Sequence, residues 1–373
     1  MMNLIWQQLE MWISSLKSQL SNWKNHTKLF SVIPVPIAGA FVTGVCLSLL
    51  FAACTSPNST NSNLANSSAS PVSNTTGAKA SIVRFGYQKS VILLKAKGVL
   101  EKRLKPEGIG VEWIEFPAGP QLLEAMNIGS IDFGHAGESP PIFAQAAGAN
   151  LTYIAGIAAN PAGSAILVPK NSPIKSVAEL KGKKIAFQKG SSAHYLLLQI
   201  LEKAGLKYSD IQPISLPPAD ARAAFVKGSI DAWSIWDPFY AAAEKSANAR
   251  VLIDGKEINR QGGYYLASRK FADNNPQTIK AILEEIKKLE DWSDKHRDEV
   301  AATLSPVLGV DLDTMKRATQ RKTFGIVPID EKLIAEQQKV ADKYYQLKLI
   351  PKQISVRDAT LTPQQYAAFS PKI

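Results

Sequence analysis

Cysteine is almost absent from the chain. Its 373 residues include two cysteines, Cys46 and Cys54, and both lie near the N-terminus. The long remainder therefore has neither a disulfide framework nor a thiolate metal site. Histidine is also rare, and the residues are far apart and lack the spacing of zinc ligands: His26, His135, His194 and His296. We expect no metal and no cofactor.

Catalytic motifs are missing as well. The sequence contains no GxSxG turn, HExxH pair or P-loop, and no GxGxxG fingerprint follows a predicted strand. Two acids, Glu138 and Asp237, would face each other across a cleft if the chain forms two matching lobes, as the carboxylate pair of a glycosidase does. Capping a helix, or holding closed lobes together, is the simpler role for them. We predict a binding protein and keep two alternatives, a secreted hydrolase and a purely structural envelope lipoprotein.

Blocks of one charge sign are lacking too. The net charge is +11, but lysine and arginine are scattered and are not interleaved with aromatic residues. We therefore expect no nucleic-acid partner and only a mild attraction for anionic ligands or lipid headgroups. Apolar residues, in contrast, are plentiful: 45% of the chain is hydrophobic and 20% is charged, which is ample for a core. The length suits two lobes with additional segments.

The N-terminal segment has the features of an export signal. Residues 33–54 form an uncharged apolar run that follows several lysines and ends in two alanines before Cys54. Residues 55–80 are rich in Ser, Asn and Thr and cannot bury a core, so we predict a disordered tether there. A cysteine in this context resembles a bacterial lipoprotein signal, in which Cys54 would be lipidated; the alternative for residues 1–54 is an uncleaved membrane anchor. Both place the body outside the cytoplasm, in the periplasm or on the outer face of the cell membrane.

The body of the chain contains one kind of unit twice. The stretch GSIDFGHAGESPP begins at Gly129, and GSIDAWSIWDPF begins at Gly228. Around these stretches strand, loop and helix patterns alternate in the same order, starting near Ile82 and again near Lys183. Such alternation predicts two α/β lobes, each a mixed sheet flanked by helices. Each glycine suits the end of a helix, and the aspartate of each repeat suits a turn or a cap better than a ligand contact.

The chain is predicted to cross between the two lobes twice. We expect residues 81–168 and 265–373 to form the first lobe and residues 169–264 to form the second. The extended runs 163–173 and 262–271 would cross between the lobes and form a two-strand hinge. The C-terminal segment is mostly helical by its apolar periodicity, and we expect it to pack on the outside of the first lobe. We expect a monomer.

The loops that follow the strands form the predicted site, since ligands of open α/β sheets bind beyond the carboxyl ends of the strands. Several of these loops put Gly, Ser or Pro at a helix start, where free N–H groups and the positive end of the helix dipole bind anions. Aromatic residues among them suit the wall of an apolar pocket. The predicted ligand-binding residues are Gln88, Ser90, Gly119, Gly137, Glu138, Ser191, Ser192, His194, Trp236, Asp237 and Tyr264.

The joint order of several segments resembles a known family. The segments FGYQKS, GSIDFGHAGESPPIFAQAAGA, KKIAFQKGSSAHYLLL and KGSIDAWSIWDPF, with others between Ser81 and Phe271, are similar to the extracytoplasmic aliphatic-sulfonate-binding proteins of ABC importers. The resemblance implies a two-lobed type II periplasmic-binding fold, no catalysis, and delivery of an alkanesulfonate to a permease and its ATPase subunit. Neighbouring families bind taurine, nitrate, bicarbonate or a pyrimidine precursor of thiamine, and these ligands remain the alternatives.

The loop chemistry predicts how a sulfonate would be held. Lys89 and Lys189 lie in matching loops, and we interpret both as solvent-facing side chains. A sulfonate spreads one charge over three oxygens and is a poor base, so neutral N–H and O–H donors at helix starts suit it. We predict that the GSSAH segment from Gly190 and the HAGES segment from His135 supply most oxygen contacts. Trp236 and the tyrosines would cover the alkyl tail.

Overall fold

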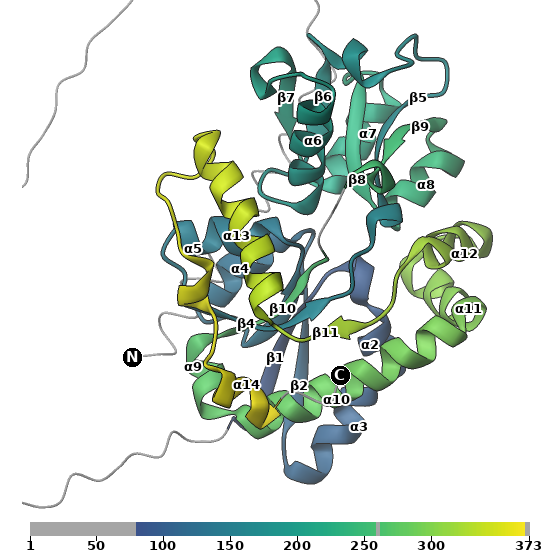
Figure 1. Ribbon diagram of the computed structural model, residues 1–373. Helices are drawn as coiled ribbons and strands as arrows, with labels where there is room; N and C mark the ends of the chain where they lie inside the picture. Colours follow the sequence, from purple (N-terminus) through teal and green to yellow (C-terminus); the bar gives the residue numbers. More distant parts are fainter. Residues whose placement is uncertain (1–79, 259–261, 370–373) are drawn as a thin grey trace, which may run out of the picture. The chain divides into compact units, whose positions relative to one another are not determined.

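The computed structural model of the chain describes residues 80–258 and 262–369 (Figure 1). The chain divides into two units, Met1–Pro71 and Val72–Ile373, and all described residues belong to the second. The predicted leader with Cys54, and the tether up to residue 79, lie outside the described residues. Within the described part, no helix is both long and apolar enough to cross a bilayer, and no group of His, Cys, Asp and Glu is placed to hold a metal ion.

Two mixed sheets form the framework of the described residues. The first sheet has the strand order β11-β4-β10-β3-β1-β2, and the second has the order β7-β6-β8-β5-β9. The strands of the first sheet are β1 (Ile82–Tyr87), β2 (Gly110–Glu115), β3 (Phe133–Ala136), β4 (Leu151–Ile157), β10 (Tyr264–Ser268) and β11 (Ile326–Val327). Those of the second sheet are β5 (Ser164–Pro169), β6 (Lys184–Phe187), β7 (Gln212–Ser215), β8 (Ala232–Trp236) and β9 (Ala249–Asp254). The predicted α/β class with two mixed sheets is confirmed.

The two sheets repeat one arrangement. In each, a set of parallel strands (β2-β1-β3 or β7-β6-β8) is followed by an antiparallel strand, β10 or β5, and then by β4 or β9. The aspartates of the two GSID stretches occupy equivalent positions. The Arg84 N–H donates to Asp132 Oδ2 at 2.9 Å, and the Lys184 N–H donates to Asp231 Oδ2 at 2.8 Å. The aspartate of each GSID stretch therefore has the same role. It precedes β3 or β8 and accepts a backbone N–H of the neighbouring parallel strand, β1 or β6.

Helices cover both faces of each sheet. Their bounds are α2 (Leu93–Lys97), α3 (Val99–Leu104), α4 (Gly119–Asn127), α5 (Ser139–Ala146), α6 (Ser192–Lys203), α7 (Pro218–Val226), α8 (Phe239–Ser246), α9 (Arg269–Asn274), α10 (Pro276–Lys295), α11 (Arg297–Leu308), α12 (Leu312–Arg321), α13 (Glu331–Gln346) and α14 (Pro363–Phe369). We call the first sheet with its helices the first lobe: α2, α3 and α10 pack on one face and α4, α5 and α13 on the other. We call the second sheet with α6 on one face and α7 and α8 on the other the second lobe.

The predicted boundaries between the lobes fall inside two strands of the structure. The boundary predicted after residue 168 falls inside β5, which pairs with β8 and β9 of the second sheet. The boundary predicted after residue 264 falls inside β10, which pairs with β3 and β4 of the first sheet. A large part of each extended run is thus a strand of a single sheet, β5 in the second sheet and β10 in the first. We propose that the chain crosses between the lobes in the connections from β4 to β5 and from β9 to β10.

The C-terminal helices do more than cover the first lobe. α10 and α13 pack on the first sheet, and β11 joins its edge beside β4. α12, in contrast, packs against α8 of the second lobe (Figure 1). There the Arg321 guanidinium lies 3.8 Å from the centroid of the Tyr240 ring and pairs with Glu244, and Lys245 pairs with Asp311. α11 and α12 pack on each other and form a unit that spans both lobes, which we call the α11–α12 hairpin.

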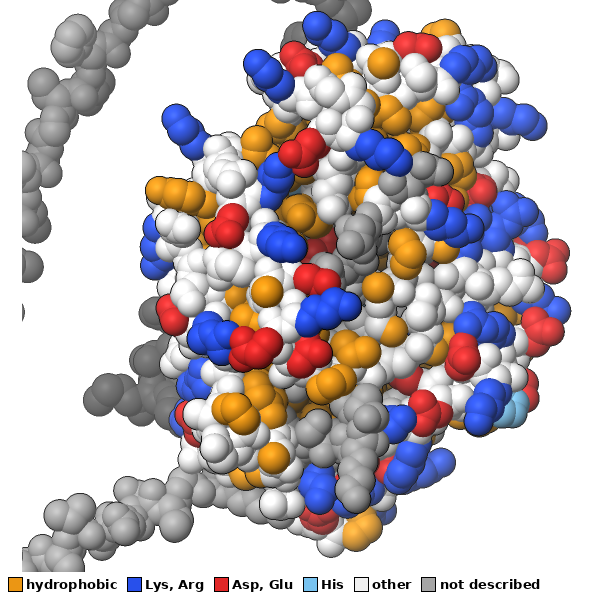
Figure 2. Space-filling view, viewed as in Figure 1, with side chains coloured by type: hydrophobic (Ala, Val, Ile, Leu, Met, Phe, Trp, Pro, Cys, Tyr) orange, Lys and Arg blue, Asp and Glu red, His pale blue; other side chains and the backbone are white. Residues whose placement is uncertain are grey.

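Charge is distributed over the surface as the sequence predicts. On the face shown in Figure 2, lysine and arginine side chains lie among acidic ones and among scattered apolar side chains. Surface ion pairs of the described residues include Arg357 with Glu331 and Lys343 with Glu202. The basic balance of the chain is therefore spread over this face of the protein and is not gathered in one patch there.

Candidate ligand-binding site

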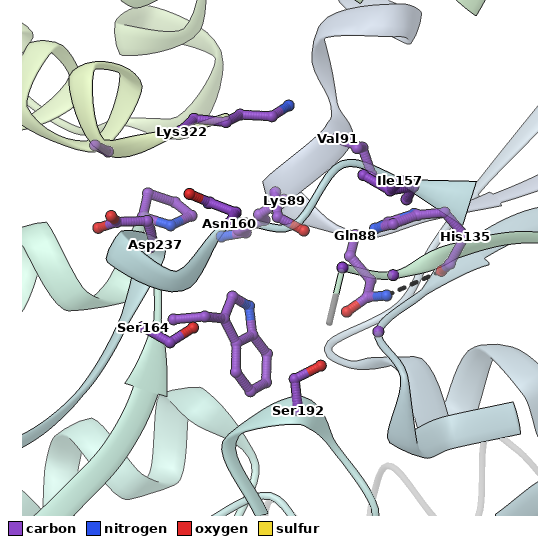
Figure 3. A pocket seen from close by; sticks show the side chains of 18 of the residues that line it. Gln88, Lys89, Val91, His135, Ile157, Asn160, Ser164, Ser192, Asp237 and Lys322 are labelled. Atoms are coloured by element: carbon purple, nitrogen blue, oxygen red, sulfur yellow. Dashed lines mark hydrogen bonds between the residues drawn. The ribbon is translucent and has the colours of Figure 1, made fainter. Parts of the chain in front are cut away.

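A cavity of about 190 Å³ lies between loops of the two lobes. Most of the predicted ligand-binding residues line it: Gln88, Ser90, Gly119, Gly137, Glu138, Ser191, Ser192, Trp236 and Asp237. Figure 3 shows Gln88 on one side of the cavity and Ser192 and Asp237 on the side of the second lobe. The carboxyl ends of the strands in both lobes therefore meet at one cavity, as the strand-end rule predicts.

Helix starts from both lobes reach the cavity wall. Gly119 is the first residue of α4 and Glu138 precedes α5, both in the first lobe. Ser192 is the first residue of α6 and Pro238 precedes α8, both in the second lobe. The first N–H groups of a helix have no partner within the helix and lie at the positive end of its dipole. The starts of α4 in the first lobe and α6 in the second can therefore offer N–H groups to an anion. The start of α5 offers fewer, because Pro140 and Pro141 have no N–H, and at the start of α8 the Ala241 N–H already donates to Asp237.

The first-lobe wall contains a neutral amide and a neutral imidazole. The buried Gln88 follows β1, and its Nε2 donates to the carbonyl oxygen of His135 at 3.1 Å (Figure 3). His135 also lines the cavity. Burial lowers the pKa of His135 to about 3, with Lys322 as a smaller cause, so the imidazole carries no charge at neutral pH. Gln88 and His135 therefore supply neutral polar groups to this wall and no positive charge.

Ser192 and Glu138 join the two lobes directly. The Ser192 hydroxyl donates to Glu138 Oε2 at 2.8 Å, and the Glu138 side chain is fully buried. Behind it, Gln337 Nε2 of α13 donates to the Glu138 carbonyl oxygen at 2.6 Å. Gly137 approaches the same hydroxyl so closely that a Cβ at residue 137 would lie 1.7 Å from Ser192 Oγ. The two lobes therefore touch each other at this contact. A hydrogen bond between the lobes is the role in holding them together that the sequence analysis considered for Glu138.

Asp237 is held by the start of α8 and by the α11–α12 hairpin. Its Oδ1 accepts the Ala241 N–H at 2.9 Å and lies 3.6 Å from Arg321 Nη1. Burial raises the pKa of Asp237 to about 6, although Arg321 and the Ala241 N–H act in the opposite direction. Both acids of the carboxylate pair considered for a glycosidase are thus engaged in contacts that join parts of the fold.

Two predicted residues, His194 and Tyr264, do not line the cavity. The fully buried His194 ring stacks on Phe187 at 4.6 Å, and its Nδ1 accepts the Gly190 N–H at 3.3 Å. His194 lies two residues after Ser192, a turn of about 200° around the helix, so its side chain faces the core when Ser192 faces the cavity. Tyr264 packs edge-on against Tyr153, with the ring centroids 4.8 Å apart. Successive side chains of a strand point to opposite faces, so Tyr264 points to the other face of the sheet than the residue that follows it in β10.

Several lining residues were not predicted. Asn160 and Ser164 come from the connection between β4 and β5 and from the start of β5. Apolar side chains come from the α11–α12 hairpin: Val300, Leu304, Leu308, Met315 and Ala318. They recur at helical spacing, which is a visible signal, but the same spacing is typical of a helix that faces an ordinary core. Nothing in the pattern of the sequence says that this face borders a cavity.

A lysine that the loop analysis did not consider also reaches the cavity. Lys322 follows α12, lines the cavity, and extends over it in Figure 3. Its Nζ lies 3.6 Å from Glu290 Oε1 and 4.6 Å from the centroid of the Phe324 ring. Lys89 lines the cavity as well and is exposed, whereas Lys189 is exposed and does not line it. The cavity therefore has positive charge near it from residues 89 and 322.

Comparison with known proteins agrees with this geometry. Residues 104–299 match the NMT1/THI5 like family. An aliphatic sulfonates-binding protein of Escherichia coli (strain K12) is 46% identical over 287 residues, which are 76% of this chain and 89% of the relative. The alkanesulfonate-binding protein SsuA from Xanthomonas axonopodis pv. citri, solved bound to MOPS, is 42% identical and superposes with a TM-score of 0.74 over 76% of this chain and 99% of that one. The periplasmic aliphatic sulphonate binding protein SsuA from Escherichia coli gives 44% identity, a TM-score of 0.69, and coverage of 76% and 93%. The chain belongs to the aliphatic sulfonate-binding proteins, a group of two-lobed periplasmic binding proteins within the NMT1/THI5 like family.

Proposed function

We propose that the protein is the substrate-binding component of an ABC importer that captures an aliphatic sulfonate between its lobes. It would deliver this ligand to a membrane permease and its ATPase subunit. The observation that carries the proposal is the meeting of helix starts from both lobes at one cavity, beside the contact between Ser192 and Glu138. A ligand at this place touches both lobes at once and therefore favours their closure.

The donors at the cavity suit a sulfonate. The amide of Gln88, the hydroxyls of Ser90 and Ser164, and the N–H groups at the start of α6 are neutral donors. A sulfonate divides one negative charge among three oxygens, so several such donors can share it without a direct ion pair. Lys322 adds positive charge at the opposite wall, where it raises the affinity for any anion.

The alternative ligands fit less well. Nitrate and bicarbonate have no apolar part and would leave the apolar residues of the α11–α12 hairpin in water. Taurine has a positive amino group at the end where this apolar wall lies, and that group would lose its hydration there. A secreted hydrolase is disfavoured because Glu138 and Asp237 are already bound to other groups of the protein.

Calorimetric titration tests the proposed function. We expect butane-1-sulfonate to bind with one site per protein, and nitrate and bicarbonate to give no comparable heat. Ser192→Leu should weaken the binding of butane-1-sulfonate about tenfold or more, since excess volume in a packed site costs about 1–3 kcal/mol. The matched surface variant Lys189→Met should change it less than about twofold, as exposed charges contribute little. A larger loss in Lys189→Met than in Ser192→Leu would contradict the proposed use of neutral donors.

We also infer that Cys54 carries a lipid that holds the protein at the membrane. The support is the apolar run before Cys54 and the polar tether after it. The relative solved from Escherichia coli is described as periplasmic, which agrees with a body outside the cytoplasm. Cys54→Ser should release the body into the soluble extracytoplasmic fraction or leave an unprocessed precursor, as seen by fractionation and mass spectrometry. Processing and membrane retention like those of the parent would rule out lipid attachment at this residue.

A further inference from the structure

Helix α13 holds the loop that carries Glu138 at two neighbouring residues. Gln337 Nε2 donates to the carbonyl oxygen of Glu138 at 2.6 Å, and the Tyr344 hydroxyl donates to Ser139 Oγ at 2.9 Å. Gln337 and Tyr344 are separated by about two helical turns, so they project from the same side of α13. That side faces the start of α5, and Figure 1 shows α13 beside α4 and α5 on this face of the first lobe.

All the residues of this attachment are buried. Glu138, Ser139 and Tyr344 have no exposed surface, and Gln337 is 1% exposed. The Gln337 amide also donates to the Tyr153 hydroxyl of β4 at 3.1 Å, so the first sheet helps to fix its direction. A buried acceptor that loses its donor has no water to take the donor's place. The position of Glu138 therefore depends on the hydrogen bonds that α13 supplies.

The same helix also contacts the second lobe. The centroid of the Tyr344 ring lies 5.4 Å from that of the His194 ring and 5.8 Å from that of the Tyr195 ring, both on α6. On the side of the first lobe, the Tyr344 ring packs edge-on against Phe143 of α5, with the centroids 4.8 Å apart. Helix α13 thus packs against both α5 and α6, the two helices whose starts meet where the lobes touch.

The contact at these helix starts is the hydrogen bond from the Ser192 hydroxyl to Glu138 Oε2 at 2.8 Å. Its partners belong to different lobes, so it forms only while the lobes are closed on each other. A hydrogen bond to a carboxylate is worth about tenfold or more in an equilibrium constant, and it weakens steeply when its geometry is disturbed. A ligand that requires closed lobes gains affinity from every contact that only the closed form makes.

We infer that Gln337 and Tyr344 are positioning residues for the closed form, since they hold Glu138 where the Ser192 hydroxyl reaches it. They raise the affinity for the ligand without touching it, because neither residue lines the cavity. This inference rests on the proposed function and deepens it. It assigns to α13, a helix late in the chain, control over a contact between the starts of α5 and α6.

A double-mutant cycle measures whether Gln337 acts through the contact between the lobes. Methionine has about the length and the helix propensity of glutamine, so Gln337→Met removes two hydrogen bonds with little change of shape. In calorimetric titration of the full-length protein with butane-1-sulfonate, Ser192→Ala should weaken binding about tenfold and Gln337→Met about fivefold. Adding Gln337→Met to Ser192→Ala should cost less than about twofold more, because the contact is already lost. A role in stability alone would give equal losses in both backgrounds.

Gln338→Met is the matched control for Gln337→Met. Gln338 is the next residue of α13, and it bonds to the Ile354 carbonyl oxygen and the Val356 N–H, neither of which belongs to a residue that lines the cavity. Its loss should lower the stability to urea and leave the affinity for butane-1-sulfonate within about twofold of the parent. A loss of affinity as large as that of Gln337→Met would contradict the inference.

A second pair of variants keeps the test independent of how Gln337→Met folds. Tyr344→Phe removes only the hydroxyl that donates to Ser139 and keeps the buried ring, so it should weaken binding about threefold in the parent and not in Ser192→Ala. Tyr345 is 43% exposed, and Tyr345→Phe should bind as the parent does.

The inference and the proposed function fail in different ways. Unchanged affinity in Gln337→Met and Tyr344→Phe, or losses of the same size in the parent and in Ser192→Ala, would overturn the inference and leave the proposed function standing. Failure of the parent to bind any alkanesulfonate would overturn both.

Discussion

Replacing Gly137 with valine should abolish sulfonate binding and leave both lobes folded. The atoms nearest to a Cβ at residue 137 all belong to Ser192, with Oγ at 1.7 Å and Cβ at 3.1 Å. The new side chain therefore collides with the second lobe and with nothing nearer in its own lobe. The backbone of Gly137 is not in the left-handed region, so a side chain there brings no local strain. Rotation of the Ser192 hydroxyl would relieve the shortest contact but would break its hydrogen bond to Glu138, and the valine methyl groups would still press on Ser192 Cβ. We therefore expect the lobes to part, and the ligand then loses one of its two walls.

The expected loss of affinity in Gly137→Val is about a hundredfold or more, or about 2.7 kcal/mol. Small-angle scattering should show compaction of the parent with saturating butane-1-sulfonate and no compaction of the variant. Gly110→Val is a suitable control, since a Cβ at the start of β2 meets its nearest atom at an ordinary 3.6 Å. The pair Gly137→Ala with Ser192→Gly should recover part of the affinity, because the second change removes the colliding group. Normal binding by Gly137→Val would show that closure at this contact is not required.

Arg321→Met should destabilise the protein more at neutral pH than at acidic pH. Arg321 pairs with Glu244 and lies 3.6 Å from Asp237, and the three side chains are only 12–18% exposed. Removing one partner of a buried ion pair costs about 3–5 kcal/mol, and partial exposure here reduces the expected loss to about 2 kcal/mol. Arg321 also joins α12 to α8, so its loss weakens the attachment of the hairpin to the second lobe.

The pH dependence comes from Asp237. Burial raises its folded pKa to about 6, above the value of about 3.9 in an unfolded chain, so its contribution to stability is fully present below pH 4 and is lost as the pH rises through 6. Arg321 opposes this rise by favouring the charged carboxylate. Without Arg321 the charged form is held less well, and the deficit of the variant should grow between pH 5 and pH 7.5.

Urea unfolding of parent and variant at those two pH values measures the effect of Arg321→Met. Arg317→Met is the matched control, because Arg317 pairs with the same Glu244 at 3.3 Å but is 57% exposed, and its loss should cost less than about 1 kcal/mol. An equal deficit for Arg321→Met at pH 5 and pH 7.5 would contradict the assignment of the pH dependence to Asp237.

Much of the fold could be predicted from the sequence because one order of strands, loops and helices occurs twice in it. The GSID stretches, with the same order of strands and helices around them, predict two lobes, and the sheets do share one strand order. The predicted family is confirmed by relatives whose alignment with this chain covers most of the length of the relative. The membership of β5 and β10 was not predictable in the same way. An extended run can pair with the sheet before it or after it, and only contacts distant in sequence decide between the two.

The site was predictable where it depends on loops and not where it depends on helix faces. Gln88, Gly137 and Ser192 follow strands, and the strand-end rule places them together regardless of side-chain detail. His194 does not line the cavity, because its side chain lies two residues after Ser192 on α6 and points in nearly the opposite direction. The hairpin residues were missed because an apolar stripe such as Val300, Leu304 and Leu308 looks the same whether it faces a core or a cavity.

The position of β10 in the first sheet governs the order in which the two lobes can be completed during synthesis. The ribosome finishes β4 at Ile157 and does not reach β10 until Tyr264, yet β10 lies between β3 and β4. Every strand of the second sheet, from β5 to β9, is made in that interval. A nascent chain that ends before Tyr264 can hold a complete second sheet, while β3 and β4 still present unpaired backbone groups towards the gap between them. The second lobe is thus the part of the protein that can be finished first, although it is the second to begin.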